Sequence, residues 1–323
     1  MTDIDYMRRA LQIAANGRGL TRSNPMVGAV IAAPDGRIIG EGWHRRYGEG
    51  HAEVNAVASV NETDRALLRE STIYVTLEPC SHFGKTPPCA HLLRDCGFRR
   101  VVVGAGDPNP KVNGRGIAIL REAGIEVECG LLAEESRCLN HVFFTAQEQR
   151  RPFVTLKWAQ SADGFMDIRR RPGEPAFRFS TPLTTLSTMR LRAENQAVLS
   201  TAATVEADNA RLTVRNWEGA LDQPRRVVVE HGDRAPWAER LAALFAEGVT
   251  SILVEAGPTF LNHILASGVW DALRVEISPD RLADRGAKHA PSIPSDLVVA
   301  DRAAGPNRVL WCSNNPLFTP EAT

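Results

Sequence analysis

One histidine and two cysteines stand in the first third of this 323-residue sequence at a spacing that suits a metal site. His51 opens the tripeptide His51-Ala52-Glu53, Cys80 follows a proline, and eight residues separate Cys80 from Cys89. An imidazole and two thiolates form a ligand set that suits Zn²⁺, and three protein ligands leave the fourth tetrahedral position to water. The pattern predicts a catalytic zinc site, where the metal lowers the pKa of its water to about 7.

Glu53 gives the predicted site a proton carrier. It lies two residues after His51 at the same expected helix start, so its carboxylate can reach the water without binding the metal. Zinc deaminases of nucleobases use a glutamate in this way, although the eight-residue interval between the cysteines departs from their usual spacing. A structural zinc would take a fourth ligand, for which His82 and His91 are candidates. We favour the catalytic kind, because a structural zinc leaves Glu53 without a role.

The elements that would position these residues alternate between strands and helices. Thr2 can cap a helix whose apolar residues recur at helical spacing, and two apolar runs around the turn Pro34-Asp35-Gly36 predict a β-hairpin. Further strands are expected over 73–77, 101–104 and 125–127, and further helices from 51, from 90, over 117–123 and over 133–149. This order predicts a three-layer α/β sandwich.

A polar stretch over 147–152 is the expected linker, and we place the two domains at 1–148 and 149–323. Later strands are expected over 153–158, 197–199, 226–229, 252–254 and 273–277, with helices between most of them. The second half is therefore a second α/β domain. Its turn Ala256-Gly257-Pro258-Thr259 opens a helix whose free backbone N–H groups suit a phosphate, although many such turns look alike.

Composition narrows the class of protein. The 38 Lys and Arg residues balance 38 Asp and Glu, so the chain lacks the positive excess that nucleic-acid binding needs. No apolar run reaches the roughly 18 residues of a membrane span, and the first residues lack the apolar core of a signal peptide. The six cysteines are sparse and unevenly placed, which argues against a disulfide framework. We expect a cytoplasmic protein that binds neither nucleic acid nor membrane.

Longer motifs resemble one family, the bacterial bifunctional deaminase/reductase of riboflavin biosynthesis. Those of the first half are Asn24–Val30, Gly50–Val54, Thr76–Cys89 and Asp107–Pro110. Those of the second half are Lys157–Gly164, Leu191–Ala193, Thr204–Asn209, Leu212–Arg215 and Val254–Thr259. The resemblance covers nearly the whole chain. It implies a cytidine-deaminase-like three-layer αβα sandwich followed by a dihydrofolate-reductase-like α/β domain.

The resemblance implies two successive reactions on a small phosphorylated pyrimidine, and a homodimer formed through the reductase half. Zinc-dependent hydrolysis deaminates 2,5-diamino-6-ribosylamino-4(3H)-pyrimidinone 5′-phosphate, and NADPH then reduces its ribosyl chain to ribityl. Carried over by position, His51, Cys80 and Cys89 hold zinc and Glu53 moves the proton. Asn24, Lys85 and the loop 111–115 would contact the deaminase substrate. The reductase substrate would contact Arg192, Leu212, Arg215 and Glu255, and NADPH would contact Ala159, Thr204, Asp208 and Gly257.

Three other interpretations stay open from the sequence. The segment between the strands at Val227 and Ile252 is shorter than is usual in the family, which leaves room for a deaminase with an inactive or altered reductase half. A zinc deaminase of another nucleoside or nucleotide would share the zinc ligands and Glu53. A zinc-stabilised binding module would share the ligands but release no ammonia.

Overall fold

The structure is a computed structural model that describes residues 1–320 apart from 82–86, 110–111, 172–173 and 218–221. The chain divides into two compact units, unit 1 (Met1–Gln149) and unit 2 (Arg150–Thr323), and this division lies one residue from the predicted domain boundary. Among the described residues, none of the helices has the length and apolar character that crossing a bilayer requires.

Unit 1 alternates helices and strands along the chain. Its elements are α1 (Asp3–Ala14), η1 (Ala15–Gly17), β1 (Gly28–Ala32), β2 (Ile38–Trp43), α2 (Ala52–Ala58), η2 (Glu62–Glu70), β3 (Thr72–Leu77), α3 (Cys89–Cys96), β4 (Arg100–Ala105), α4 (Arg115–Glu122), β5 (Glu126–Cys129), α5 (Ala133–Leu139) and α6 (His141–Gln149), where η marks a 3₁₀ helix. Strands β1 and β2 form the predicted antiparallel hairpin, and β3, β4 and β5 run parallel to one another.

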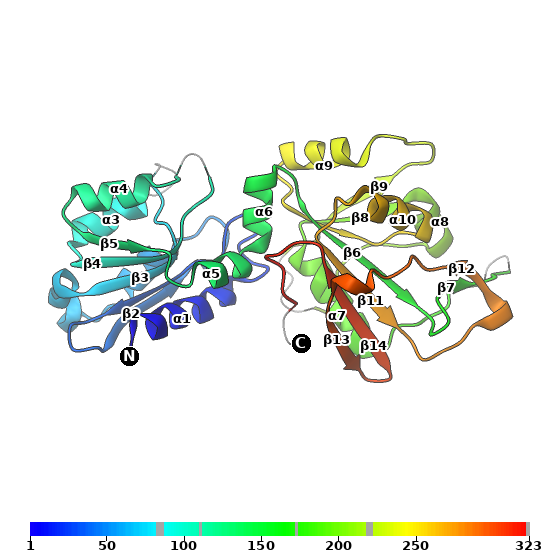
Figure 1. The fold of residues 1–323 in the computed structure, drawn as a ribbon, viewed down its shortest axis with the longest axis horizontal. Coiled ribbons are helices and arrows are strands. Elements are labelled where there is room, and N and C mark those ends of the chain that lie inside the picture. The colour runs from blue at the N-terminus through cyan, green and yellow to red at the C-terminus, as the bar shows by residue number, and fades with distance from the viewer. Residues whose placement is uncertain (82–86, 110–111, 172–173, 218–221, 321–323) are drawn as a thin grey trace. The chain divides into compact units, whose positions relative to one another are not determined.

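The sheet of unit 1 has the order β2-β1-β3-β4-β5 and carries helices on both faces (Figure 1). On one face Met7 and Ala10 of α1 pack with Val30 and Tyr74. On the other face α2, α3 and α4 pack over Ile31 and its neighbours. Val30 and Ile31 point to opposite faces because side chains alternate along a strand. The predicted three-layer sandwich is confirmed.

The helix predicted at the start of unit 1 is confirmed, whereas the single helix predicted at its end is wrong. Helix α1 starts as expected: the Thr2 hydroxyl accepts the N–H of Asp5 at 3.4 Å, and the Asp5 carboxylate accepts the N–H of Thr2 at 2.7 Å. The single helix expected over 133–149 is instead two helices. Asn140 lies between them, and its side chain accepts from the N–H of Met26 at 2.7 Å and donates to the Met26 carbonyl at 2.9 Å. These two hydrogen bonds connect the residue between α5 and α6 to the segment just before β1.

Unit 2 is built on a larger sheet. Its elements are β6 (Phe153–Gln160), β7 (Phe165–Ile168), α7 (Pro182–Glu194), β8 (Ala197–Thr201), α8 (Ala202–Asp208), β9 (Arg225–Val229), α9 (Trp237–Ala246), β10 (Ser251–Val254), α10 (Pro258–Ser267), β11 (Ala272–Ile277), η3 (Ala283–Arg285), β12 (Gly286–His289), η4 (Ser295–Leu297), β13 (Val298–Ala304) and β14 (Asn307–Ser313). The strand order is β13-β14-β11-β6-β10-β8-β9, and β7 pairs with β12 in a separate ribbon.

The five strands predicted for unit 2 are its parallel strands, β11, β6, β10, β8 and β9. Leu241 of α9 and Leu261 of α10 pack on one face of this sheet with Val254. Leu253, the neighbouring residue of β10, faces the other side and packs with Leu212. Antiparallel strands β13 and β14 extend the sheet beyond β11. The sequence did not indicate these two strands or the β7–β12 ribbon. Charged residues interrupt the apolar pattern of β13 and β14, and β7 and β12 have only four residues each.

A glycine at the start of β1 tests the close packing of α1 on the sheet. A Cβ atom on Gly28 would lie 2.0 Å from the Ala10 carbonyl oxygen, whereas one on Gly106 would find nothing closer than 4.0 Å. We predict that Gly28→Ala lowers the free energy of unfolding by about 3 kcal/mol, because the clash is with helix backbone. Gly106→Ala should change it by less than about 0.5 kcal/mol. Urea denaturation followed by circular dichroism measures both, and equal stabilities would contradict the close approach.

Candidate functional sites

The three predicted zinc ligands of unit 1 meet at the starts of two helices. His51 is the residue that caps α2, Cys80 follows β3, and Cys89 is the first residue of α3. The backbone N–H of Cys89 donates to the Cys80 sulfur at 3.3 Å, and the N–H of Ala90 donates to the Cys80 carbonyl at 3.1 Å. The first turn of a helix leaves such N–H groups without partners inside the helix, so it can hold an anionic sulfur.

The spacing of the ligand atoms fits a tetrahedral zinc ion. His51 Nδ1 lies 3.5 Å from Cys80 Sγ and 3.4 Å from Cys89 Sγ. Zn–S bonds of about 2.3 Å and Zn–N bonds of about 2.0 Å give a tetrahedral N···S edge of about 3.5 Å. Among the described residues, the set of ligand atoms within 4.8 Å of one another comprises these three residues and not His91. The other candidate for a fourth ligand, His82, lies outside the described residues.

The two cysteines differ in acidity. Hydrogen bonding from the Cys89 thiol, followed by that from His51, lowers the pKa of Cys80 to about 4. The same contact with Cys80, together with burial, raises the pKa of Cys89 well above the ordinary thiol value. Contact with Cys80 also raises the pKa of His51. Cys80 is therefore the more acidic thiol, and the thiolate is the form that binds a metal.

Glu53 lies beside the three ligands, as the sequence predicted. It belongs to the first turn of α2, only 3% of it is exposed, and its carboxylate is within hydrogen-bonding reach of the Cys89 thiol. Burial, and after it the negative charge of Cys80, raises the pKa of Glu53 to about 7. A carboxyl group with this pKa can both take and give a proton at neutral pH.

Asn24 reaches the zinc site through a histidine that the sequence analysis did not single out. Its side-chain nitrogen lies 3.2 Å from Nε2 of His44, and His44 Nδ1 lies 3.2 Å from the Gly50 carbonyl oxygen. A carbonyl can only accept, so Nδ1 carries the proton and Nε2 accepts from Asn24. Burial lowers the pKa of His44, which favours this neutral form, and its ring lies 5.5 Å from that of His51. The position of His44 directly after β2 was the available clue.

Glu78 fixes the chain around Cys80. Its buried carboxylate accepts backbone N–H groups of Gly114 and Gly116, each at 3.0 Å, and so holds the start of α4. A Cβ atom on Gly116 would lie 2.0 Å from the Pro79 carbonyl, so α4 approaches the residue before Cys80 closely. Residues 112–115 belong to the loop that the family resemblance implies for the deaminase substrate, and they lead into this helix. Lys85 and Lys111, which the resemblance implies for the same substrate, lie outside the described residues.

In unit 2 the structure joins two predicted substrate residues as a buried ion pair. Arg192 Nε donates to Glu255 at 2.6 Å and Nη2 donates to it at 3.0 Å, while Nη1 donates to the Thr213 carbonyl at 2.9 Å. Burial alone would raise the pKa of Glu255, but the bonds from Arg192 and the charge of Lys157 outweigh burial and lower it. Glu255 is therefore ionised at neutral pH.

Lys157 is a half-buried lysine that was not predicted as a site residue. It lies on β6 beside Arg274 of β11, and burial lowers its pKa while Glu255 opposes that shift. In the part of the chain that the structure describes, the Lys157 ammonium forms no hydrogen bond or ion pair, although its charge acts on Glu255. An ionisable group whose pKa is shifted by burial and by a charged neighbour is typical of ligand sites. A lysine within the apolar run of β6 was the clue in the sequence.

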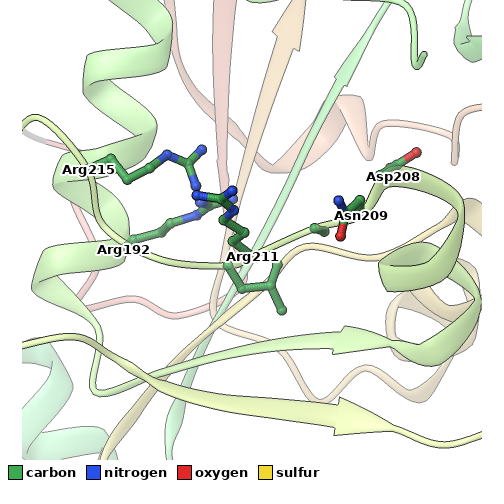
Figure 2. A pocket seen from close by; sticks show the side chains of 7 residues that line it. Arg192, Asp208, Asn209, Arg211 and Arg215 are labelled. Atoms are coloured by element: carbon green, nitrogen blue, oxygen red, sulfur yellow. The ribbon is translucent and has the colours of Figure 1, made fainter.

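A pocket of about 380 Å³ collects most of the predicted reductase-substrate residues. Arg192, Leu212 and Arg215 line it together with Arg211, which was not predicted, and with Asp208, which was predicted for the cofactor. Figure 2 shows the guanidinium groups of the three arginines directed toward the same space, whereas the Asp208 carboxylate points away from them. The pocket is therefore suited to an anion.

The residues predicted for NADPH are only partly brought together. Thr204 Oγ1 accepts the backbone N–H of Gly257 at 3.1 Å, and Gly257 caps α10 with Pro258 in its first turn. Asp208 instead pairs with Arg170 at 2.5 Å. Ala159 lies on β6 and packs against a small apolar cluster around Ile168.

Fold and sites together define a class: a zinc-binding deaminase domain joined to a reductase domain. Residues 1–105 match the family described as the cytidine and deoxycytidylate deaminase zinc-binding region, and residues 152–296 match the RibD C-terminal domain. The chain is 35% identical to the riboflavin biosynthesis protein RibD of Escherichia coli (strain K12), over 93% of this chain and 94% of that protein. The chain thus belongs to the RibD family of bifunctional riboflavin biosynthesis enzymes.

Solved structures agree with this assignment. Acinetobacter baumannii RibD is similar with a TM-score of 0.86 and 30% identity, over 96% of this chain and 98% of that one. The Thermotoga maritima diaminohydroxyphosphoribosylaminopyrimidine deaminase/5-amino-6-(5-phosphoribosylamino)uracil reductase is similar with a TM-score of 0.82 and 31% identity, over the same shares. The family resemblance and the fold class expected from the sequence are confirmed.

Zinc content tests the metal site. We predict about one zinc per chain for the wild type, and loss of at least about nine-tenths of it in Cys89→Ala, because two ligands rarely hold the metal. Cys138→Ala is the matched control, since Cys138 is a half-buried thiol outside the cluster. Atomic absorption on the purified full chain measures the content. Full zinc in Cys89→Ala would contradict the assignment of the ligands.

Proposed function

We propose that unit 1 deaminates 2,5-diamino-6-ribosylamino-4(3H)-pyrimidinone 5′-phosphate and that unit 2 then reduces the ribosyl chain of the product with NADPH. The observation that carries the first step is the cluster of His51, Cys80 and Cys89, whose ligand atoms lie within 4.8 Å of one another beside buried Glu53. Support for the second step comes from the RibD C-terminal domain match and from the Thermotoga maritima relative, which is named for both activities.

In the proposed deamination, His51, Cys80 and Cys89 hold zinc and Glu53 handles the proton. Zinc held by these residues would supply a water of lowered pKa. Glu53 would accept a proton as water adds to the ring carbon that carries the 2-amino group. The same carboxyl group then gives the proton to the amine as the C–N bond breaks, and ammonia leaves. The nearly complete burial of Glu53 supports this role, because it keeps other proton donors away.

Two contacts would hold the pyrimidine ribotide in unit 1. We assign Asn24 to the ring or ribose, supported by its hydrogen bond to His44, which fixes the amide beside the zinc ligands. We assign Lys85 and the loop 111–115 to the phosphate, by the position of these residues in the family motifs. The ammonium of a lysine and the backbone N–H groups of a loop suit a phosphate.

In the proposed reduction, NADPH supplies the hydride that C1′ of the ribose accepts. Thr204 and Gly257 would hold the cofactor at the start of α10, where free N–H groups favour phosphate. We keep Ala159 and Asp208 as further cofactor contacts. Arg192, Leu212, Arg215 and Glu255 would hold the substrate. The pocket that Arg192, Leu212 and Arg215 line supports this grouping, and Glu255 joins it through its bond from Arg192. NADPH rather than NADH is part of the proposal and is tested by comparing the two cofactors in the reductase assay.

We also propose that the enzyme works in the cytoplasm as a homodimer, as the family resemblance implies. Sedimentation equilibrium of the full chain tests the dimer: a mass near twice the chain's 35.3 kDa supports it, and a mass near 35.3 kDa contradicts it.

Replacing Glu53 tests the deaminase step. We predict that Glu53→Gln keeps its zinc but lowers ammonia release from the diaminopyrimidine ribotide by at least about 10³-fold, because the amide cannot move the proton. Glu49→Gln, a change four residues earlier at an exposed position, is the control and should keep wild-type activity. Ammonia is measured by a coupled assay and zinc by atomic absorption.

The same assay separates the competing functions. Wild-type release of ammonia from the ribotide with no later NADPH oxidation would leave a deaminase with an inactive reductase half. Faster turnover of cytidine than of the ribotide would indicate a deaminase of another nucleoside. A wild-type chain that binds zinc and releases no ammonia from either compound would be a binding module, and the proposal would fail.

A further inference from the structure

The arginine pocket of unit 2 contains one positive charge that no other group compensates and that the proposed substrate contacts do not use. Arg211 lines the pocket with Arg192 and Arg215, and its side chain is exposed. Within the described residues Arg211 forms no ion pair and no hydrogen bond. An arginine that points into a pocket without an acidic partner is available to an anionic ligand.

The other charges of the pocket are already engaged to different degrees. Arg192 is neutralised by its two bonds to Glu255. Among the described residues, the Arg215 side chain forms one hydrogen bond, from Nη1 to the hydroxyl of Thr213 at 3.2 Å, and so keeps its charge. Asp208, the acid of the pocket, pairs with Arg170 and points away from the three guanidinium groups (Figure 2). Arg211 and Arg215 therefore supply the positive charge that a ligand would meet.

The backbone that carries Arg211 is fixed from the core. Leu212, the next residue, is 3% exposed and packs with Val198 and Leu253 beneath the pocket. It adopts φ +58°, a left-handed conformation that is unfavourable for a leucine and persists only where surrounding structure enforces it. Arg211 thus starts from a defined position on the pocket rim, although its side chain is exposed.

We propose that Arg211 is a specificity-determining residue of the reductase half, which with Arg215 binds the 5′-phosphate of the substrate. The inference rests on the proposed function. The charges agree: a phosphate monoester carries about −1.5 to −2 at neutral pH, and two unneutralised arginines match it. Arg192 then chiefly holds Glu255 in place, and the N–H groups that it does not donate to Glu255 or Thr213 would be available to the same phosphate. Each guanidinium offers a planar set of donors that suits phosphate oxygens.

The test compares substrates with and without the phosphate. In the full chain, Arg211→Gln should raise the KM for 5-amino-6-ribosylaminouracil 5′-phosphate about tenfold with kcat within about twofold, the effect expected of a partly exposed charged hydrogen bond. The KM for the same compound without its phosphate should not change. Arg211→Lys should recover part of the loss. Arg234→Gln removes an exposed arginine of unit 2 outside the pocket and should behave as wild type.

Several results would overturn the role of Arg211. An unchanged KM, or an equal rise in KM for both compounds, would mean that Arg211 does not recognise the phosphate. A rise in the KM for NADPH that NADH does not share would assign Arg211 to the cofactor's own phosphate.

A binding measurement keeps this inference separate from the proposed function. Wild-type chain that oxidises no NADPH would remove the reductase assignment, whereas calorimetric titration with ribose 5-phosphate needs no turnover. About tenfold weaker binding of that probe by Arg211→Gln supports the inference by itself. Equal binding by the two chains, or no binding by the wild type, contradicts it.

Discussion

A tetrahedral metal centre built from one imidazole and two thiolates requires three separate segments of unit 1 to meet within a few ångströms, and the rest of that unit serves this requirement. The proposed ligands come from the start of α2, the loop after β3 and the start of α3. Close helix-to-sheet packing sets the position of α2: a Cβ atom on Gly42 of β2 would lie 2.2 Å from the Ala56 nitrogen. Glu78 and the N–H of Cys89 fix the chain around Cys80. The N···S distances of 3.4 and 3.5 Å follow from this packing.

Unit 2 meets a different constraint, the burial of charge. Arg192 and Glu255 neutralise each other at the pocket, and Glu276 accepts from Ser180 at 2.9 Å deeper in the sheet. Arg274 is 3% exposed. Among the described residues its Nη1 has no hydrogen-bond partner, and the charge is compensated by a longer ion pair, with the Glu276 carboxylate at 3.8 Å. Buried charge is costly unless it is paired, so such a cluster is more typical of a ligand site than of a structural core. Ligand binding in unit 2 therefore depends on which of these buried charges are neutralised within the protein and which are left for the ligand.

The sequence predicted the parts of the molecule that follow from local patterns. The capping residue Thr2, the hairpin turn and the buried parallel strands each have a short-range pattern, and the zinc ligands have a specific spacing. It could not predict features set by contacts distant in sequence. Asn140 breaks a helix by bonding to a residue 114 positions away, and His44 enters the zinc site through the fold of the hairpin. Nothing in the sequence distinguishes Arg211 from other loop arginines, because its position in one pocket with Arg192 depends on the fold.

The central claim is that one chain performs two reactions in a fixed order with separate residues. The most direct measurement follows NADPH oxidation by the full-length Glu53→Gln chain, first with the diaminopyrimidine ribotide and then with the already deaminated uracil ribotide. We predict no oxidation with the first compound and the wild-type rate with the second, because the reductase residues lie in unit 2. Oxidation at the wild-type rate with the diaminopyrimidine ribotide, or no oxidation with the uracil ribotide by a wild-type chain, would contradict it.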